Sequence, residues 1–147
     1  MKIADRIVGT LLLIGAAVTL FYWWSYLSGS DVMVLRARWY TAFESSFPVA
    51  DAWMAFCMAM AGLGFVLQRR FAAPFGLMAG ATLLYLAAMD ITFDVENGMY
   101  AMAATNGAMK FEVFINVTTI FLGLVTLAIS WWRIRRRTDD RESIVRE

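Results

Sequence analysis

Residues 71–92 read FAAPFGLMAGATLLYLAAMDIT, an apolar run whose single charged side chain, Asp90, comes near its end. A helix rises about 1.5 Å per residue, so roughly 20 apolar residues cross the hydrocarbon core of a bilayer. A lone strand would leave its backbone groups unpaired in lipid, whereas a helix satisfies them internally. The run therefore predicts a membrane-spanning helix.

Three more stretches have the same character, at residues 7–27, 48–68 and 113–132. None of them carries a charge in its middle. The first continues through Phe21, Tyr22, Trp23 and Trp24 without a good cleavage site, which favours a retained helix over a signal peptide. The sequence thus predicts an all-α fold: a single domain of four transmembrane helices over residues 1–132, followed by a charged tail at residues 133–147.

The composition excludes several classes of protein. Of the 147 residues, 61% are hydrophobic and only 17% are charged, which is unlike a soluble or a disordered chain. The net charge of +1 argues against a nucleic-acid partner. With no histidine and one cysteine, the chain lacks a zinc signature and an intramolecular disulfide. It also shows no haem, iron–sulfur or nucleotide signature.

The basic residues indicate the orientation of the helices. Ten of them lie on the side of the N-terminus, whereas Arg36, Arg38 and Lys110 lie in the two loops on the other side. Because cytoplasmic loops are enriched in Lys and Arg, we expect both termini in the cytoplasm and a multi-pass protein of a bacterial-type inner membrane. The cytoplasmic side then has ten basic and five acidic residues, net +5, and the outer side three basic and seven acidic, net −4.

The connections differ in length and chemistry. The link at residues 68–70 is so short that the second and third spans must form an antiparallel hairpin. The arginine-rich tail after Trp132 is typical of a stop-transfer anchor followed by a disordered end. Attraction of these arginines to anionic lipid headgroups is the alternative interpretation.

Small residues mark one face of each span, and packing is the simplest explanation for them. Gly76 and Gly80 form a Gly-xxx-Gly pair that suits either a helix within the chain or a homo-oligomer. The fourth span has a face on which every residue is polar or small, at steps of three and four: Glu112, Asn116, Thr119, Gly123, Thr126 and Ser130.

Acidic residues gather at one level of the membrane. Asp90 lies about 29 Å along its helix from Phe71, at the outer edge of the hydrocarbon. Asp51, Glu112 and Asn116 open the second and fourth spans at the same level. The set continues with Asp94, Glu96 and Asn97, and with Glu44 in the preceding loop. Ionisable groups at such depths are functional candidates, so we take all eight as the candidate ligand-binding set.

The strongest of these candidates are Asp90 and Asp94. Asp51 lies in a helical first turn after Ser46, a candidate N-cap, and Pro48, so it suits either a helix start or a site. Asp90 and Asp94 instead lie at a helix C-terminus, where the dipole disfavours negative charge, and they repel each other across one turn. The pair implies a compensating cation, a shared proton, or an arginine (Arg36 or Arg38) folded over it.

The two outer loops carry local signals of their own, a short helix in the first and a helix end in the second. Residues 31–44 suit a short interfacial helix with Leu35, Trp39 and Phe43 on its lipid side. We expect this helix to be a connector on the membrane surface, with a cap over the acidic residues as the alternative. Asn97 and Gly98 are typical of a helix C-terminus that needs a left-handed residue.

Three functions fit these features. In the first, an outward-facing acidic pocket binds or transports a cation: a small cationic or amphipathic ligand, a proton, or a divalent metal held by Asp90 and Asp94. In the second, the chain is a membrane enzyme that uses paired carboxylates for acid–base chemistry on a lipid-like substrate, as an isomerase would. In the third, it is an accessory or assembly subunit of a membrane complex.

Overall fold

The computed structural model describes residues 2–30 and 32–145, with side chains described for residues 3–30 and 32–136. In chain order the helices are α1 (Lys2–Leu27), α2 (Arg38–Glu44), α3 (Pro48–Val66), α4 (Ala72–Glu96), the 3₁₀ helix η1 (Met99–Ala104) and α5 (Gly107–Val145). Four of them are long and apolar enough to cross a membrane. The described part of the chain contains no strand, which confirms the prediction of an all-helical chain with four candidate spans.

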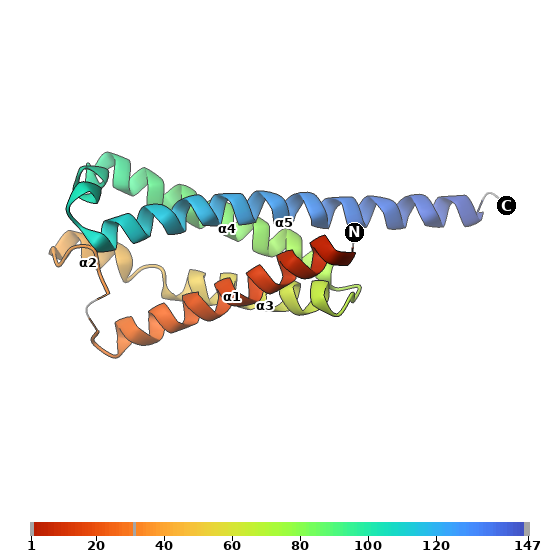
Figure 1. The fold of residues 1–147 in the computed structure, drawn as a ribbon, viewed down its shortest axis with the longest axis horizontal. Helices are drawn as coiled ribbons and strands as arrows, with labels where there is room; N and C mark the ends of the chain where they lie inside the picture. The colour runs from red at the N-terminus through yellow and green to blue at the C-terminus, as the bar shows by residue number, and fades with distance from the viewer. Residues whose placement is uncertain (1, 31, 146–147) are drawn as a thin grey trace.

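The four long helices form two pairs. α1 packs against α3, α4 packs against α5, and α3 joins the pairs through its contact with α4 (Figure 1). The helices converge at the end that holds the α3–α4 turn and the start of α1, beyond which α5 continues alone, and they spread apart toward α2 and η1 (Figure 1). We call these the turn end and the α2 end.

Glycines allow the helices to approach closely. A Cβ atom built on Gly62 would lie 2.7 Å from the carbonyl oxygen of Gly9, so α3 meets the backbone of α1 there. A Cβ atom on Gly80 would lie 2.9 Å from the carbonyl oxygen of Gly123. A larger residue at either glycine forces the helices apart. The Gly-xxx-Gly pair of α4 therefore packs against α5 within the chain.

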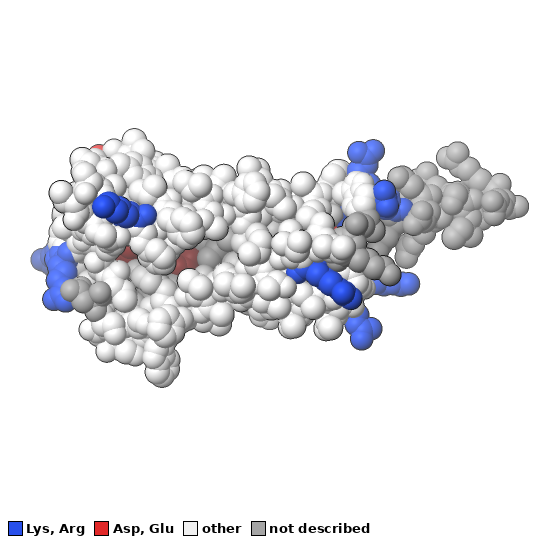
Figure 2. Space-filling view, in the orientation of Figure 1, with Lys and Arg blue, Asp and Glu red and all other residues white. Residues whose placement is uncertain are grey.

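The outer surface of the bundle suits lipid. One side of α1 exposes large apolar residues at helical spacing, among them Ile7, Leu11, Ile14 and Val18. On the face in view, Lys and Arg side chains lie toward the two ends of the bundle, with a largely uncharged surface between them (Figure 2). In water such a surface would be costly, whereas in a bilayer it contacts acyl chains.

The helices extend beyond several predicted boundaries. α1 begins at Lys2 rather than near residue 7, and α4 continues past Thr92 to Glu96. α3 ends at Val66, where a turn with Gln68 at φ 55° leads into α4. α5 starts at Gly107 and runs to Val145, so residues 133–145 are helical where we expected a disordered end. A basic, mixed-charge sequence at the end of a helix can simply prolong it.

One predicted helix end is confirmed and one is wrong. Gly98 has φ 64° after the last turn of α4, which confirms the left-handed residue. Ser46 was expected to cap α3, but the capping position is Phe47, and the Ser46 hydroxyl donates to the Phe43 carbonyl at 2.6 Å. Pro48 occupies the first turn of α3 as expected.

The segment before α3 covers the α2 end of the bundle. Tyr40 of α2 is buried with Met99 and Met109, in a small apolar core separate from the main one. The Asn106 amide donates to the Val34 carbonyl at 3.1 Å and its side-chain oxygen accepts from the backbone of α5. The loop is more than a connector, because it contributes the buried side chain of Tyr40, and Phe43, which we expected on the lipid side, packs on α4, whereas Trp39 is exposed as expected.

Candidate functional site

Five carboxylates from four helices lie at the α2 end, and we call them the acidic cluster: Glu44, Asp51, Asp90, Asp94 and Glu112. Figure 2 shows acidic side chains inside a hollow of the surface between the two helix pairs. The two helix pairs spread apart at this end, and α2 lies between their ends (Figure 1).

Tyr40 connects two of these carboxylates. Its hydroxyl oxygen lies 2.8 Å from Glu44 Oε1 and 3.2 Å from Glu112 Oε2. A phenol has one hydrogen, so Tyr40 donates to one carboxylate at a time, with the shorter contact favouring Glu44. Tyr22 of α1 donates to the other oxygen of Glu44 at 3.3 Å. These hydrogen bonds link α1, α2 and α5 through the acidic cluster.

Asp51 is held by a separate donor. The indole nitrogen of the buried Trp23 donates to Asp51 Oδ2 at 2.8 Å. A hydrogen bond of this length fixes the carboxyl group of Asp51 relative to the ring of Trp23. Asp51 therefore belongs both to the first turn of α3, as its sequence position predicts, and to the acidic cluster.

Asp94 is the most exceptional member of the acidic cluster. Its exposed fraction is 0%, and neither of its carboxylate oxygens has a hydrogen-bond partner of good geometry, although Glu112 and the Tyr100 hydroxyl lie near enough to interact with it. Glu112 and Tyr100 are its polar neighbours, and the amide nitrogen of the buried Asn116 is likewise unpartnered. A buried carboxylate without a donor or a counter-charge is strongly disfavoured.

Asp90 adds to the accumulation of negative charge. It lies one turn before Asp94 on α4, within electrostatic range of Glu44, Asp51 and Asp94. Within residues 3–30 and 32–136, no Lys or Arg forms an ion pair with any member of the acidic cluster; the ion pair described there joins Arg133 and Asp5. The neutralising arginine that the sequence allowed is therefore not seen on Asp90 or Asp94.

Tyr100 lies beside the acidic cluster, outside the spanning helices. Burial raises the pKa of its hydroxyl, and the negative charge of Asp94 raises it further. The phenol thus stays protonated and available as a donor at this edge of the acidic cluster.

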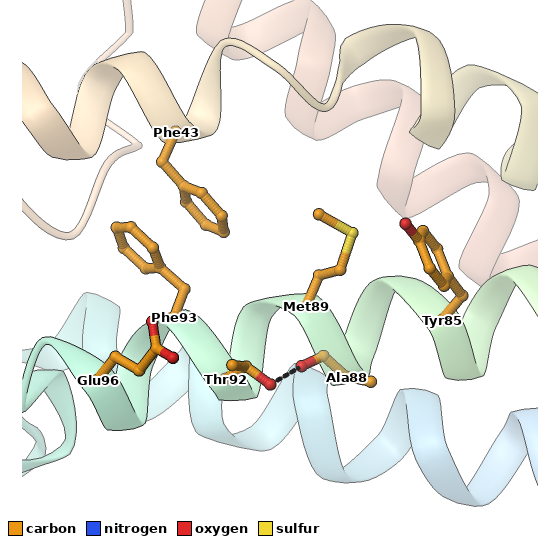
Figure 3. Close-up of a pocket in the computed structure, with 7 residues that line it drawn as sticks. All are labelled: Phe43, Tyr85, Ala88, Met89, Thr92, Phe93 and Glu96. Carbon is orange, nitrogen blue, oxygen red and sulfur yellow. Dashed lines mark hydrogen bonds between the residues drawn. The ribbon is translucent and has the colours of Figure 1, made fainter.

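An apolar groove of about 370 Å³ is lined by residues of α2 and α4, and none of the five carboxylates of the acidic cluster belongs to its lining. Figure 3 shows Phe43 of α2 facing Phe93 and Met89 of α4, with Tyr85 further along α4. The rings of Phe43 and Phe93 stack, with centroids 3.6 Å apart and planes 2° from parallel. Ala88, Thr92 and Glu96 complete the lining. The groove and the acidic cluster therefore share α4.

Six of the eight predicted site residues are the five carboxylates of the acidic cluster and the buried Asn116; the other two, Glu96 and Asn97, lie outside the acidic cluster. Glu96 and Asn97 are exposed. The Asn97 amide donates to the Phe93 carbonyl at 2.8 Å, so it serves the end of α4. Glu96 lines the groove from the outside.

The geometry does not form a ready metal site. Among the side chains that the structure describes, no three carboxylates or thiols lie close enough to hold one ion. Because Ca²⁺ takes six to eight oxygen ligands, single carboxylates spread over several helices are a poor cage for it.

Sequence reasoning missed three donors of the acidic cluster, Tyr22, Trp23 and Tyr40, and it also missed Tyr100, which lies beside Asp94. Tyr22 lies on the same face of α1 as Gly15 and Thr19, which was the available signal for it. Tyr40 lies one turn before Glu44 on α2, a spacing that also brings the two together.

Comparison with known proteins finds no matching family model, curated protein or solved structure. The chemistry of the site is therefore argued from its own residues.

Proposed function

We propose that this is a multi-pass membrane protein, with both termini in the cytoplasm, whose acidic cluster binds a small cationic, amphipathic ligand from the outer side. The observation that carries the proposal is Asp94, which is fully buried with two unpartnered oxygens among further carboxylates. In a medium of low polarity, such a group calls for a cation or a proton. A bound cation would supply the missing counter-charge.

The shape of the site favours an organic cation over a bare metal ion. An ammonium or quaternary centre needs only one or two carboxylates, which the spacing of Asp90 and Asp94 on successive turns offers. The apolar body of such a ligand fits the groove, where Phe43, Phe93 and Tyr85 present aromatic surface. Aromatic faces also attract cations. Apolar walls and a few charged groups are typical of small-molecule sites.

Binding of tetraphenylphosphonium, a lipophilic cation, to the purified protein in detergent tests this proposal by equilibrium dialysis. We expect wild type to bind it and Asp94→Asn to bind it at least about tenfold more weakly, a change of about 1.4 kcal/mol. Asp5→Asn is the matched control, since it makes the same exchange at a buried carboxylate of the opposite end of the bundle. Absence of binding by wild type, or equal binding by wild type and Asp94→Asn, would contradict the proposal.

Acid–base catalysis on a lipid-like substrate is the second candidate, because Asp94 and Glu112 lie side by side with Tyr100 nearby. Two adjacent carboxyl groups share protons readily, and one of them then acts as acid while the other acts as base. Incubation with membrane lipid extract in D₂O, followed by mass spectrometry, would show deuterium in a lipid if this is correct. Glu112→Gln should abolish that exchange and Glu96→Gln should not.

A further inference from the structure

One face of α4 lines the apolar groove with residues at steps of four, three and four: Tyr85, Met89, Thr92 and Glu96. All four are exposed, whereas Asp94, on another face of the same helix, is fully buried. The groove therefore opens toward the surroundings of the bundle. A molecule can occupy it without entering the interior.

The groove crosses the outer boundary of the hydrocarbon, which the length of the span places at the level of Asp90. Along the helix axis, Tyr85 lies about 8 Å to the inner side of Asp90 and Glu96 lies about 9 Å to its outer side. The inner end of the groove thus faces acyl chains, and its outer end lies at the level of the headgroups. A molecule that fills both parts has an apolar chain and a polar head.

The charge of the lining is confined to the outer end. Figure 3 shows that the Thr92 hydroxyl donates to the Ala88 carbonyl, at 2.7 Å, so this polar group of the wall is satisfied within α4. Glu96 is the charged member of the lining, which includes no Lys or Arg. Among residues 3–30 and 32–136, no basic side chain forms an ion pair with Glu96. A positively charged head is therefore complementary to the groove, and a negatively charged head is repelled.

We propose that the groove binds a single-chain cationic amphiphile, such as a long-chain amine or quaternary ammonium, taken from the outer leaflet of the membrane. The chain lies along α4 between Tyr85 and Phe93, and the cationic head lies at Glu96. A chain gains little apolar burial by moving from lipid into the groove, so the charge at Glu96 decides which amphiphiles bind. This amphiphile shares the groove with the ligand proposed above, but its counter-charge is Glu96 rather than the acidic cluster.

Photolabelling in phosphatidylcholine nanodiscs tests the occupant of the groove. The probes are tetradecyltrimethylammonium and tetradecyl sulfate, each with a diazirine at the same carbon near the end of the chain. Labelling of α4 from Tyr85 to Met89 is measured by mass spectrometry relative to the lipid-facing residues of α1, which corrects for the amount of probe in the bilayer. We expect the cationic probe to label this segment at least about threefold more than the anionic probe, as one exposed ion pair allows.

Competition separates a site from ordinary contact with the bilayer. An excess of tetradecyltrimethylammonium without the diazirine should remove the labelling of α4 and leave that of α1. Equal labelling by the two probes, or labelling of α4 that the excess does not reduce, would show contact with the bilayer only and would overturn the proposal.

Two pairs of variants test the residues of the groove. Ala88→Trp fills the groove from α4, and Ala128→Trp makes the same exchange at an exposed position of α5. Glu96→Gln removes the charge of the groove, and Asp94→Asn removes a carboxylate from the other face of α4. We expect Ala88→Trp and Glu96→Gln to lower labelling by the cationic probe at least about threefold. Their two controls should match wild type, and an equal effect of both members of either pair would overturn the proposal.

This proposal and the proposed function fail in different ways. Asp94→Asn should weaken tetraphenylphosphonium binding and leave the photolabelling unchanged. Binding of tetraphenylphosphonium without a charge preference in the labelling would retain the acidic cluster as a ligand site and remove the amphiphile site. Selective labelling of a protein that does not bind tetraphenylphosphonium would retain the amphiphile site and remove the proposed function.

Discussion

The two ends of the bundle hold buried charge in opposite ways. At the turn end, Asp5 faces Arg133, and the guanidinium also lies over an aromatic ring. At the α2 end, five carboxylates share tyrosine and tryptophan donors but pair with no cationic side chain among the described residues. Opposite charges that neutralise each other within the chain serve the fold. Carboxylates that no cationic side chain neutralises are what the proposed cation site would require.

The largest effect is expected from breaking the pair at the turn end. Arg133→Met should lower the free energy of unfolding by about 3–5 kcal/mol, because it leaves Asp5 buried without a counter-charge. Thermal unfolding in detergent micelles measures the change. The double variant Asp5→Asn, Arg133→Met should recover most of the loss, since it removes both charges. If Arg133→Met unfolds like wild type, the pair does not stabilise the turn end and the contrast between the ends disappears.

Much of the architecture could be predicted from the sequence, because hydrophobic length reports directly on membrane crossing. The four spans and the left-handed Gly98 followed from local chemistry. Asp94 was singled out because a helix C-terminus disfavours negative charge, whatever packs around it. The polar face of α5 was also visible, as a spacing of three and four residues.

The features that could not be predicted from the sequence depend on contacts between distant segments of the chain. Tyr40 meets Glu112 only because the loop before α3 folds back over the bundle, which no local pattern of α2 indicates. Asp5 and Arg133 come from opposite ends of the chain, and each is ordinary as a charge flanking a span. The divergence of the two helix pairs results from where the glycines allow close approach, and packing of this kind cannot be deduced from one helix at a time.

The next largest effect concerns the donors of the acidic cluster. Tyr40→Phe should destabilise the protein by about 1.5–3 kcal/mol, the range for hydrogen bonds to charged groups, because Glu44 and Glu112 lose their shared donor. Thermal unfolding in detergent gives the change. Tyr26→Phe is the matched control, a half-buried tyrosine whose hydroxyl makes no hydrogen bond to the described residues. An equal effect of both variants would show that the bridge adds no stability.

A change of the opposite sign is expected at Asp94. Without ligand, Asp94→Asn should raise the free energy of unfolding by about 1–3 kcal/mol, because an amide is cheaper to bury than a carboxylate without partners. The same unfolding experiment measures it, with Glu96→Gln expected to change little. Destabilisation by Asp94→Asn would mean that the carboxyl group makes an essential contact, such as a proton shared with Glu112, and it would favour the acid–base function over cation binding.

The smallest effect is expected from the aromatic stack that closes the groove. Phe43→Leu keeps an apolar side chain but removes the parallel contact with Phe93, which should destabilise the protein by about 0.5–1.5 kcal/mol. Phe121→Leu, on the exposed side of α5, makes the same exchange without a buried stack and should change less. If the stack holds α2 against α4, Phe43→Leu should also speed the release of tetraphenylphosphonium, because the end of the groove opens. Faster release with unchanged stability would assign the stack to the ligand site, and lower stability with unchanged release would assign it to the fold alone.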